Sequence, residues 1–118
     1  MGSMITPQNQ TEAKTGVSNF SSDYGTINNA GTETYLNICG KIVRFRVRFS
    51  VTNAYSAWNG SIVKINGVSI PHYQVDYFGS AQSSGALDPL SENTVGIQLG
   101  LNIAVGTELR ISGMFIMQ

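Results

Sequence analysis

Residues 41–52, KIVRFRVRFSVT, decide the fold of this chain. Apolar and polar side chains alternate strictly along the stretch. Successive side chains of a β-strand point to opposite faces of its sheet, so one face of this segment is apolar and the other is polar. We therefore predict a long, half-buried strand. Its apolar residues are Val43, Phe45, Val47, Phe49 and Val51, and its polar residues are Arg44, Arg46, Arg48, Ser50 and Thr52.

Other parts of the sequence also favour strands. Alternating runs recur at 72–78, 95–101 and 109–117, and a short β-branched run covers 61–65. In the first of these runs we expect Tyr73, Val75 and Tyr77 to face the core. Asn-Gly pairs at 59–60 and 66–67 are turn signals, and the second is expected to close a two-residue hairpin. No stretch of a dozen residues has the period of an amphipathic helix. We predict an all-β fold, an antiparallel two-sheet β-sandwich of jelly-roll type.

The chain has 118 residues, which suits a single domain. We interpret residues 1–4 as an expression remnant and start, 5–33 as a polar N-terminal arm or linker, and 34–118 as the sandwich head. Phe20 and Tyr24 favour an arm that docks on the sandwich over a loose terminus. Residues 79–93 are rich in Ser and Gly and contain Asp88, Pro89 and Asn93, so we predict a long loop there.

Composition excludes several classes of function. The net charge is zero and only 12% of residues are charged, about half the usual share, which disfavours binding nucleic acid through bulk charge. A chain with so few charged residues has much neutral surface, and because neutral surface is often an interface, we expect an oligomer. No apolar run reaches about 18 residues, so we predict no membrane insertion. One cysteine and one histidine exclude an internal disulfide framework and a multi-cysteine or two-histidine metal site. We predict no metal and no cofactor, and a buried, structural Cys39.

Catalytic patterns are absent from the sequence. A Ser-His-Asp triad would have to use His72 with Asp76, and no nucleophile-elbow spacing accompanies them. No pair of carboxylates has a spacing that indicates glycoside hydrolysis. We therefore predict no catalytic residues and no enzymatic activity.

The row of Arg44, Arg46 and Arg48 leaves three interpretations open. The row is a solvated outer face, or a subunit interface in which acids such as Glu33 or Glu108 pair with it, or a site for an anion such as the phosphates of a teichoic-acid polymer. The planar guanidinium fork suits phosphate because it donates two parallel hydrogen bonds.

Aromatic residues gather between positions 53 and 80, and the single tryptophan, Trp58, lies in a turn-like stretch. Exposed aromatic rings stack on sugar rings, and neighbouring polar side chains bind the hydroxyl groups. The stretch therefore indicates saccharide binding, and the 79–93 loop offers further polar groups. Our candidate ligand-binding residues are Trp58, Tyr55, Asn59, His72, Asp76 and Asp88.

The order of these segments resembles the C-terminal β-sandwich head of phage tail fibres, baseplate proteins and receptor-binding proteins. The segments that carry the resemblance are KIVRFRVRFSVTN at 41–53, SIVKINGVSIP at 61–71 and TVGIQLGLNIAVGTELRISGMFIMQ at 94–118. The resemblance implies a homotrimer at the tip of a virion tail. It also implies that the head attaches to a saccharide or cell-wall polymer of the host surface.

Two alternatives belong to other classes of protein. The first is a structural or trimerisation module of a virion that binds no ligand. The second is a monomeric carbohydrate-binding module of a bacterial surface protein. Burial of Trp58 would favour the first, and a monomeric mass in solution would favour the second.

Overall fold

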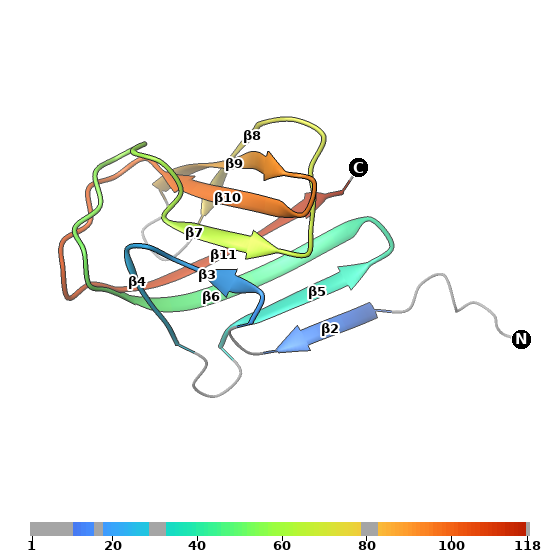
Figure 1. Ribbon diagram of the computed structural model, residues 1–118, viewed down its shortest axis with the longest axis horizontal. Helices are drawn as coiled ribbons and strands as arrows, with labels where there is room; N and C mark the ends of the chain where they lie inside the picture. Colours follow the sequence, from blue (N-terminus) through green and yellow to red (C-terminus); the bar gives the residue numbers. More distant parts are fainter. Residues whose placement is uncertain (1–10, 16–17, 29–32, 79–82, 118) are drawn as a thin grey trace, which may run out of the picture.

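A computed structural model of the chain describes residues 11–15, 18–28, 33–78 and 83–117 (Figure 1). For residues 11–15, 76–78 and 83 only the backbone is described. The described residues form strands and turns, with no helix among them. The strands are β2 (Thr11–Thr15), β3 (Phe20–Ser21), β4 (Gly25–Asn28), β5 (Tyr35–Cys39), β6 (Ile42–Val51), β7 (Val63–Asn66), β8 (Gln74–Phe78), β9 (Ser83–Ser91), β10 (Thr94–Leu99) and β11 (Glu108–Ile116).

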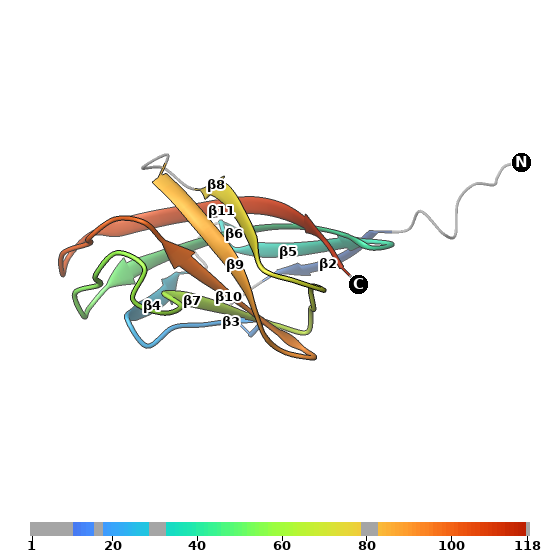
Figure 2. The same cartoon turned by 90° about the horizontal axis from the view of Figure 1, so that it is seen from above.

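Two antiparallel sheets pack face to face, as the views in Figures 1 and 2 show. The β6 sheet has the order β11-β6-β5-β2, and β4 also pairs with β6. The β10 sheet has the order β3-β7-β10-β9-β8. The predicted all-β, antiparallel two-sheet sandwich is therefore confirmed.

The stretch that predicts the fold forms the longest strand, β6. Its burial alternates along the strand, with the arginines outside and the valines and phenylalanines inside. β11 pairs with it along its length, from Glu108 opposite Ser50 to Ile116 opposite Ile42. The polar face lies outward because burying three guanidinium groups without partners is strongly unfavourable. Burying the aliphatic and aromatic side chains of the other face is favourable.

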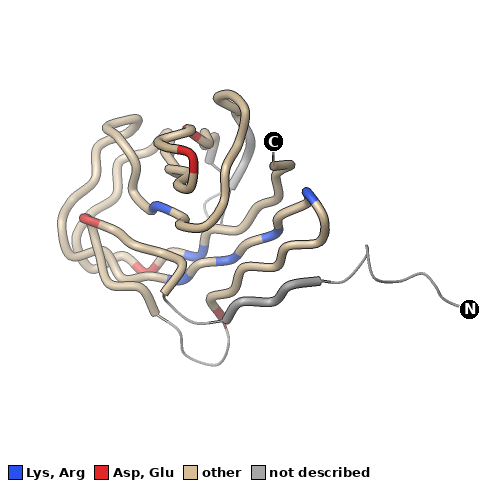
Figure 3. Tube along the Cα trace, turned by 45° about the vertical axis from the view of Figure 1, so that its right-hand side comes forward, with Lys and Arg blue, Asp and Glu red and all other residues tan. Residues whose placement is uncertain are grey.

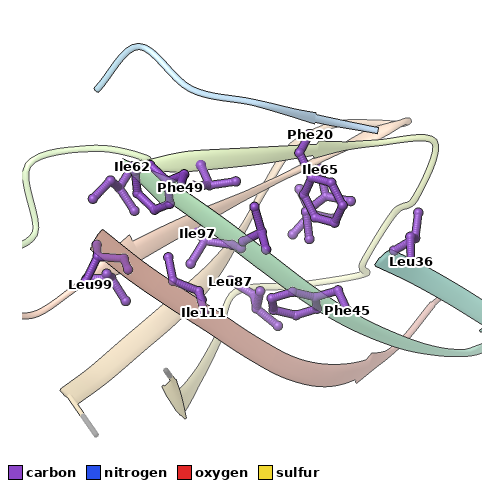
Figure 4. Close-up of a cluster of buried hydrophobic side chains, with 14 of the residues drawn as sticks. Phe20, Leu36, Phe45, Phe49, Ile62, Ile65, Leu87, Ile97, Leu99 and Ile111 are labelled. Carbon is purple, nitrogen blue, oxygen red and sulfur yellow. The ribbon is translucent and has the colours of Figure 1, made fainter. Parts of the chain in front are cut away.

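Inward-facing side chains of both sheets form one core (Figure 4). Burial of each such aliphatic or aromatic side chain contributes about 1.5–3 kcal/mol relative to exposure, so this layer holds the sheets together. Its largest fully buried members are Tyr55, Phe45, Phe49, Leu36, Ile62, Ile65, Leu87, Ile97 and Ile111.

One edge of β6 is shared by two strands. β5 pairs with β6 from Ile42 to Arg46, and β4 pairs with it from Arg48 to Val51. The buried Thr34 lies at this change of partner: its hydroxyl accepts the Arg48 N–H at 3.2 Å and donates to the Asn28 carbonyl. The hydroxyl thus supplies a hydrogen-bond partner where the ladder changes strands.

The N-terminal region is part of the sandwich rather than a separate linker. β2 and β4 pair within the β6 sheet, whereas β3 pairs with β7 in the β10 sheet. Phe20 is in the core and Tyr24 packs against it, as expected for a docked arm. The expected boundary between residues 33 and 34 therefore does not separate two structural units. Residues 5–10, 16–17 and 29–32 lie outside the described part.

The predicted loop at 79–93 is wrong for most of its length, because residues 83–91 form β9 between β8 and β10. The polar composition of this segment does not indicate a strand, yet β9 pairs with both β8 and β10. The register shifts where Pro89 faces Val95 and Ser91 faces Thr94, which leaves Leu90 as the extra residue of a bulge. Proline fits at such a bulge because it has no N–H to donate. Residues 79–82 of the predicted loop are outside the described residues.

Two smaller expectations are also wrong. Asn66-Gly67 does not close a hairpin: β7 pairs with β3 and β10, and the Gly67 N–H donates to the Asn93 carbonyl at 2.7 Å.

Tyr73 and Val75 do not face the core and are 49% and 66% exposed. β8 lies at the edge of its sheet, so alternation along it does not imply that one face is covered.

Candidate functional site

The turn that carries Trp58 is anchored to the core by Tyr55. The Tyr55 ring is buried, and its hydroxyl donates to the Gly60 carbonyl at 2.7 Å and accepts the Leu99 N–H at 3.2 Å. Tyr24 packs edge-on against this ring at a centroid distance of 5.1 Å. Burial raises the pKa of the Tyr55 phenol, which therefore stays protonated and can keep donating.

Trp58 has a backbone φ of 60°, in the left-handed region that residues with a side chain rarely adopt. Such a conformation costs on the order of 1–3 kcal/mol and persists only where neighbours hold it. Here the Trp58 N–H donates to the Leu99 carbonyl at 2.8 Å, and the Ala57 N–H donates to the Asn102 side chain at 2.9 Å. The backbone of the turn is thus held rigidly against the end of β10.

The indole of Trp58 lies on Gly100. A Cβ at residue 100 would stand 2.6 Å from Cζ2 and 3.1 Å from Nε1 of the indole, so a side chain there would displace the ring. The Gly100 N–H donates to the Ser84 carbonyl, which extends the β10–β9 ladder by one residue. The ring is therefore supported by the sheet, yet Trp58 remains 44% exposed.

The same face of the β10 sheet carries a polar pair. Val95, Ile97 and Leu99 point into the core, so Gly96 and Gln98 point outward. The Gln98 amide donates to the Asp88 carboxylate at 3.2 Å. Gly100 follows Gln98 on this face at about 6.6–6.8 Å along the strand. We call the outward group of Trp58, Gln98 and Asp88 the Trp58 platform.

The structure brings together some of the residues named from the sequence and separates others. Trp58 and Asp88 share the platform, and the exposed Asn59 follows Trp58 in the turn. Tyr55 is only 2% exposed, so its role is structural and we remove it from the candidate contacts.

His72 is exposed but belongs to the connection from β7 to β8. That connection starts at Asn66, which pairs with Thr94 at the opposite end of β10 from Leu99 and Trp58. Figure 1 shows the connection and the Trp58 turn at opposite ends of the sheet. The connection ends at Gln74, which pairs with Leu87 next to Asp88, so His72 lies toward the Asp88 side of the sheet and is separated from the Trp58 turn. The side chain of Asp76 lies outside the described part of the structure.

Sequence reasoning missed Gln98 and the role of Gly100. One signal was available: Gly96, Gln98 and Gly100 alternate with core residues in VGIQLG. Glycine inside a strand marks a close approach by another group. At Gly96 that group is the side chains of Ser61 and Leu90, and at Gly100 it is the indole.

On the opposite sheet, the arginines of β6 are not equivalent. Arg48 contacts Glu108 at 3.2 Å and Glu33 at 3.5 Å, and Glu33 also contacts Arg110 at 3.2 Å. Ser50 donates a hydrogen bond to Glu108. The pKa of the Glu108 carboxyl is lowered. The largest cause is this hydrogen bond from Ser50, and the second is the hydrogen bond from Arg48. Glu33 and Glu108, expected to pair with the arginine row across a subunit interface, thus pair with Arg48 within one chain.

Arg44 and Arg46 are exposed, and within the described residues neither makes an ion pair. At a separation of about 6.6–6.8 Å, two like charges in water repel by about 0.6 kcal/mol. That small repulsion is tolerable on a solvated strand. Exposed apolar side chains lie beside this end of the row: Ile42, Met114 and Ile116.

In the described residues, no three His, Cys, Asp or Glu side chains gather in a way that could hold a metal ion. No helix of the described chain has the length and apolar character needed to span a membrane. Cys39 is half-buried at the end of β5 rather than buried as expected.

Comparison with protein-family models, with curated proteins and with solved structures finds no match.

Proposed function

We propose that this chain is a saccharide-binding head. In this proposal it attaches to a host-surface glycan or cell-wall polymer, as the phage receptor-binding heads that its sequence resembles do. The observation that carries the proposal is the Trp58 platform, in which a half-exposed indole is seated on Gly100 beside the Asp88–Gln98 pair.

The platform offers the two kinds of contact that sugars need. The indole provides an apolar surface for the C–H face of a sugar ring. A carboxylate has about four acceptor positions, so the single bond from Gln98 leaves Asp88 able to accept hydrogen bonds from hydroxyl groups. The rigid turn keeps the ring in place before a ligand arrives, which reduces the entropy lost on binding.

Binding at one such open surface is expected to be weak. Small contact area gives little free energy after the cost of association. Heads joined as a homotrimer on a virion tail tip would raise the effective concentration of sites, and avidity can exceed single-site affinity by about 10²–10⁴. Weak individual sites are therefore compatible with firm attachment.

The test is binding of the purified chain to intact bacterial cell walls and to walls stripped of their surface polymers. We expect binding only to intact walls, and at least about a tenfold loss for Trp58→Ala, equivalent to about 1.4 kcal/mol. Ile116→Ala is the matched control because Ile116 is also exposed (58%) but lies on β11, in the opposite sheet from the platform. Equal losses for both variants, or binding unaffected by Trp58→Ala, would refute the proposal.

A second candidate is a structural module that assembles through the β6 sheet. It is favoured by Ile42, Met114 and Ile116, which are 45%, 50% and 58% exposed side by side on that sheet. Contiguous exposed apolar side chains mark interaction surfaces. A trimeric mass by light scattering with no binding to cell walls would favour this candidate. A monomeric mass with binding would favour a carbohydrate-binding module.

A further inference from the structure

The arginine row of β6 is divided into a neutralised part and an open part. Glu33 and Glu108 both lie at the Arg48 end of the row, where they pair with Arg48 and Arg110. At the other end, Arg44 and Arg46 have no acidic partner among the described residues. Their positive charges are therefore available to a ligand, whereas that of Arg48 is already compensated.

Neutral residues surround the open part. Arg44 lies between Asn37 of β5 and Met114 of β11, and Arg46 lies between Tyr35 and Ser112. Residues directly opposite in adjacent strands point to the same face of a sheet, so these four share the outer face with the arginines. Asn, Tyr and Ser side chains are hydrogen-bond donors as well as acceptors, and none adds a negative charge.

This sheet carries an excess of positive charge although the whole chain is neutral. Its strands β4, β5, β6 and β11, with residues 33, 34, 40 and 41 between them, have five basic residues and two acidic ones, and β2 adds one of each, Lys14 and Glu12. Figure 3 shows the basic residues following one another along β6. The basic residues are Lys41, Arg44, Arg46, Arg48 and Arg110, and the acidic residues are Glu33 and Glu108. Like charges on two copies of this face would repel each other, so an anion complements the arginines better than a second copy does.

We propose that Arg44 and Arg46 form a binding site for a linear polyanion that lies along β6. Their guanidinium groups suit phosphate or carboxylate oxygens because each can donate two parallel hydrogen bonds. Their spacing of about 6.6–6.8 Å on an open, flat strand favours successive anionic groups of a chain over one compact anion. The site is on the opposite sheet from the Trp58 platform and does not depend on it.

The experiment titrates the purified chain with inorganic polyphosphate by calorimetry, with poly-L-glutamate as the carboxylate probe and inorganic phosphate as the monomeric one. We expect polyphosphate to bind more tightly than phosphate, and the affinity to fall with added salt because exposed charges are screened. Arg44→Gln and Arg46→Gln should each weaken binding about three- to tenfold. Arg44→Lys should weaken it less than Arg44→Gln, because it keeps the charge but loses the fork.

Lys64→Gln is the control, since it also removes one positive charge but from the β10 sheet, where the 42% exposed Lys64 side chain lies 4.0 Å from Asp23. Thermal melting verifies that every variant is folded. Equal weakening by all three glutamine variants would mean nonspecific charge attraction and would overturn the proposal, as would a native chain that binds neither polymer. Self-association that disappears in Arg44→Gln and Arg46→Gln, without polymer binding, would overturn it in favour of an interface between copies.

Discussion

The indole of Trp58 occupies the space that a side chain at Gly100 would need, with Cζ2 and Cε2 only 2.6 and 2.9 Å from the place of a Cβ. The φ of Gly100 is outside the left-handed region, so alanine suits the backbone and only the ring has to move. The position of the candidate contact is therefore set by a glycine on a different element.

We expect Gly100→Ala to push the indole off the sheet and to weaken binding to intact cell walls about tenfold, although Trp58 itself is unchanged. Because the chain has one tryptophan, its fluorescence reports this ring alone, and the emission should shift as the ring leaves Gly100. Unchanged emission and unchanged binding would show that Gly100 does not position the ring.

Tyr55→Phe should lower the free energy of unfolding by about 1–3 kcal/mol, the cost of leaving buried polar groups without a partner. The change removes the hydroxyl that the Leu99 N–H and the Gly60 carbonyl both use. Urea denaturation measures the loss. Tyr24→Phe is the control, since the Tyr24 hydroxyl makes one exposed bond, of 3.3 Å, to Asn59. Equal losses for both variants would contradict the structural role of Tyr55.

Periodicity predicts the strands whose two faces differ in environment. In β6, β10 and β11 every second residue enters the core, so alternation in the sequence reports burial directly. In β9 only Leu87 joins the core cluster, and the strand is held by backbone pairing with β8 and β10. Backbone pairing leaves no pattern in the side chains, which is why the Ser- and Gly-rich segment 79–93 is predicted to be a loop.

The candidate site could be predicted only in part, because its geometry depends on contacts distant in sequence. Trp58 and Asp88 are recognisable by residue type, but their common face follows from the register of β10 with β9. From the sequence alone, the buried Tyr55 cannot be distinguished from an exposed tyrosine. Its burial is visible only in the folded structure. Gln98 is an ordinary outward residue of a strand until its bond to Asp88 is seen.

Thr34→Val should destabilise the sandwich by about 1–3 kcal/mol, because the Arg48 N–H and the Asn28 carbonyl lose a shared partner in a fully buried position. Valine keeps the shape of threonine, so packing changes little. Thr34→Ser keeps the hydroxyl and should retain most of this stability despite the lost methyl group. Denaturant titration of the two variants ranks them, and a serine variant less stable than the valine variant would show that packing, not hydrogen bonding, matters at this change of strands.

Glu108 makes the stability of the β6 sheet depend on pH. The Ser50 hydrogen bond and Arg48 lower its pKa in the folded chain below the ordinary 4.5. A carboxyl with a lowered folded pKa contributes stability above its unfolded pKa, and this contribution is lost as the pH falls through the folded value. Glu108→Gln should therefore be less stable than the native chain at pH 7, and the difference should shrink as the pH drops below about 4.5.

Urea midpoints of both chains between pH 7 and pH 3 measure this difference. Ser50→Ala provides the second arm, because it removes the largest cause of the lowered pKa and leaves the Arg48 contact at 3.2 Å in place. In the Ser50→Ala background, Glu108→Gln should have a smaller effect at pH 7 and a weaker dependence on pH. A difference between native and Glu108→Gln chains that stays constant across this range would mean that the carboxylate charge does not stabilise the strand pair β6–β11.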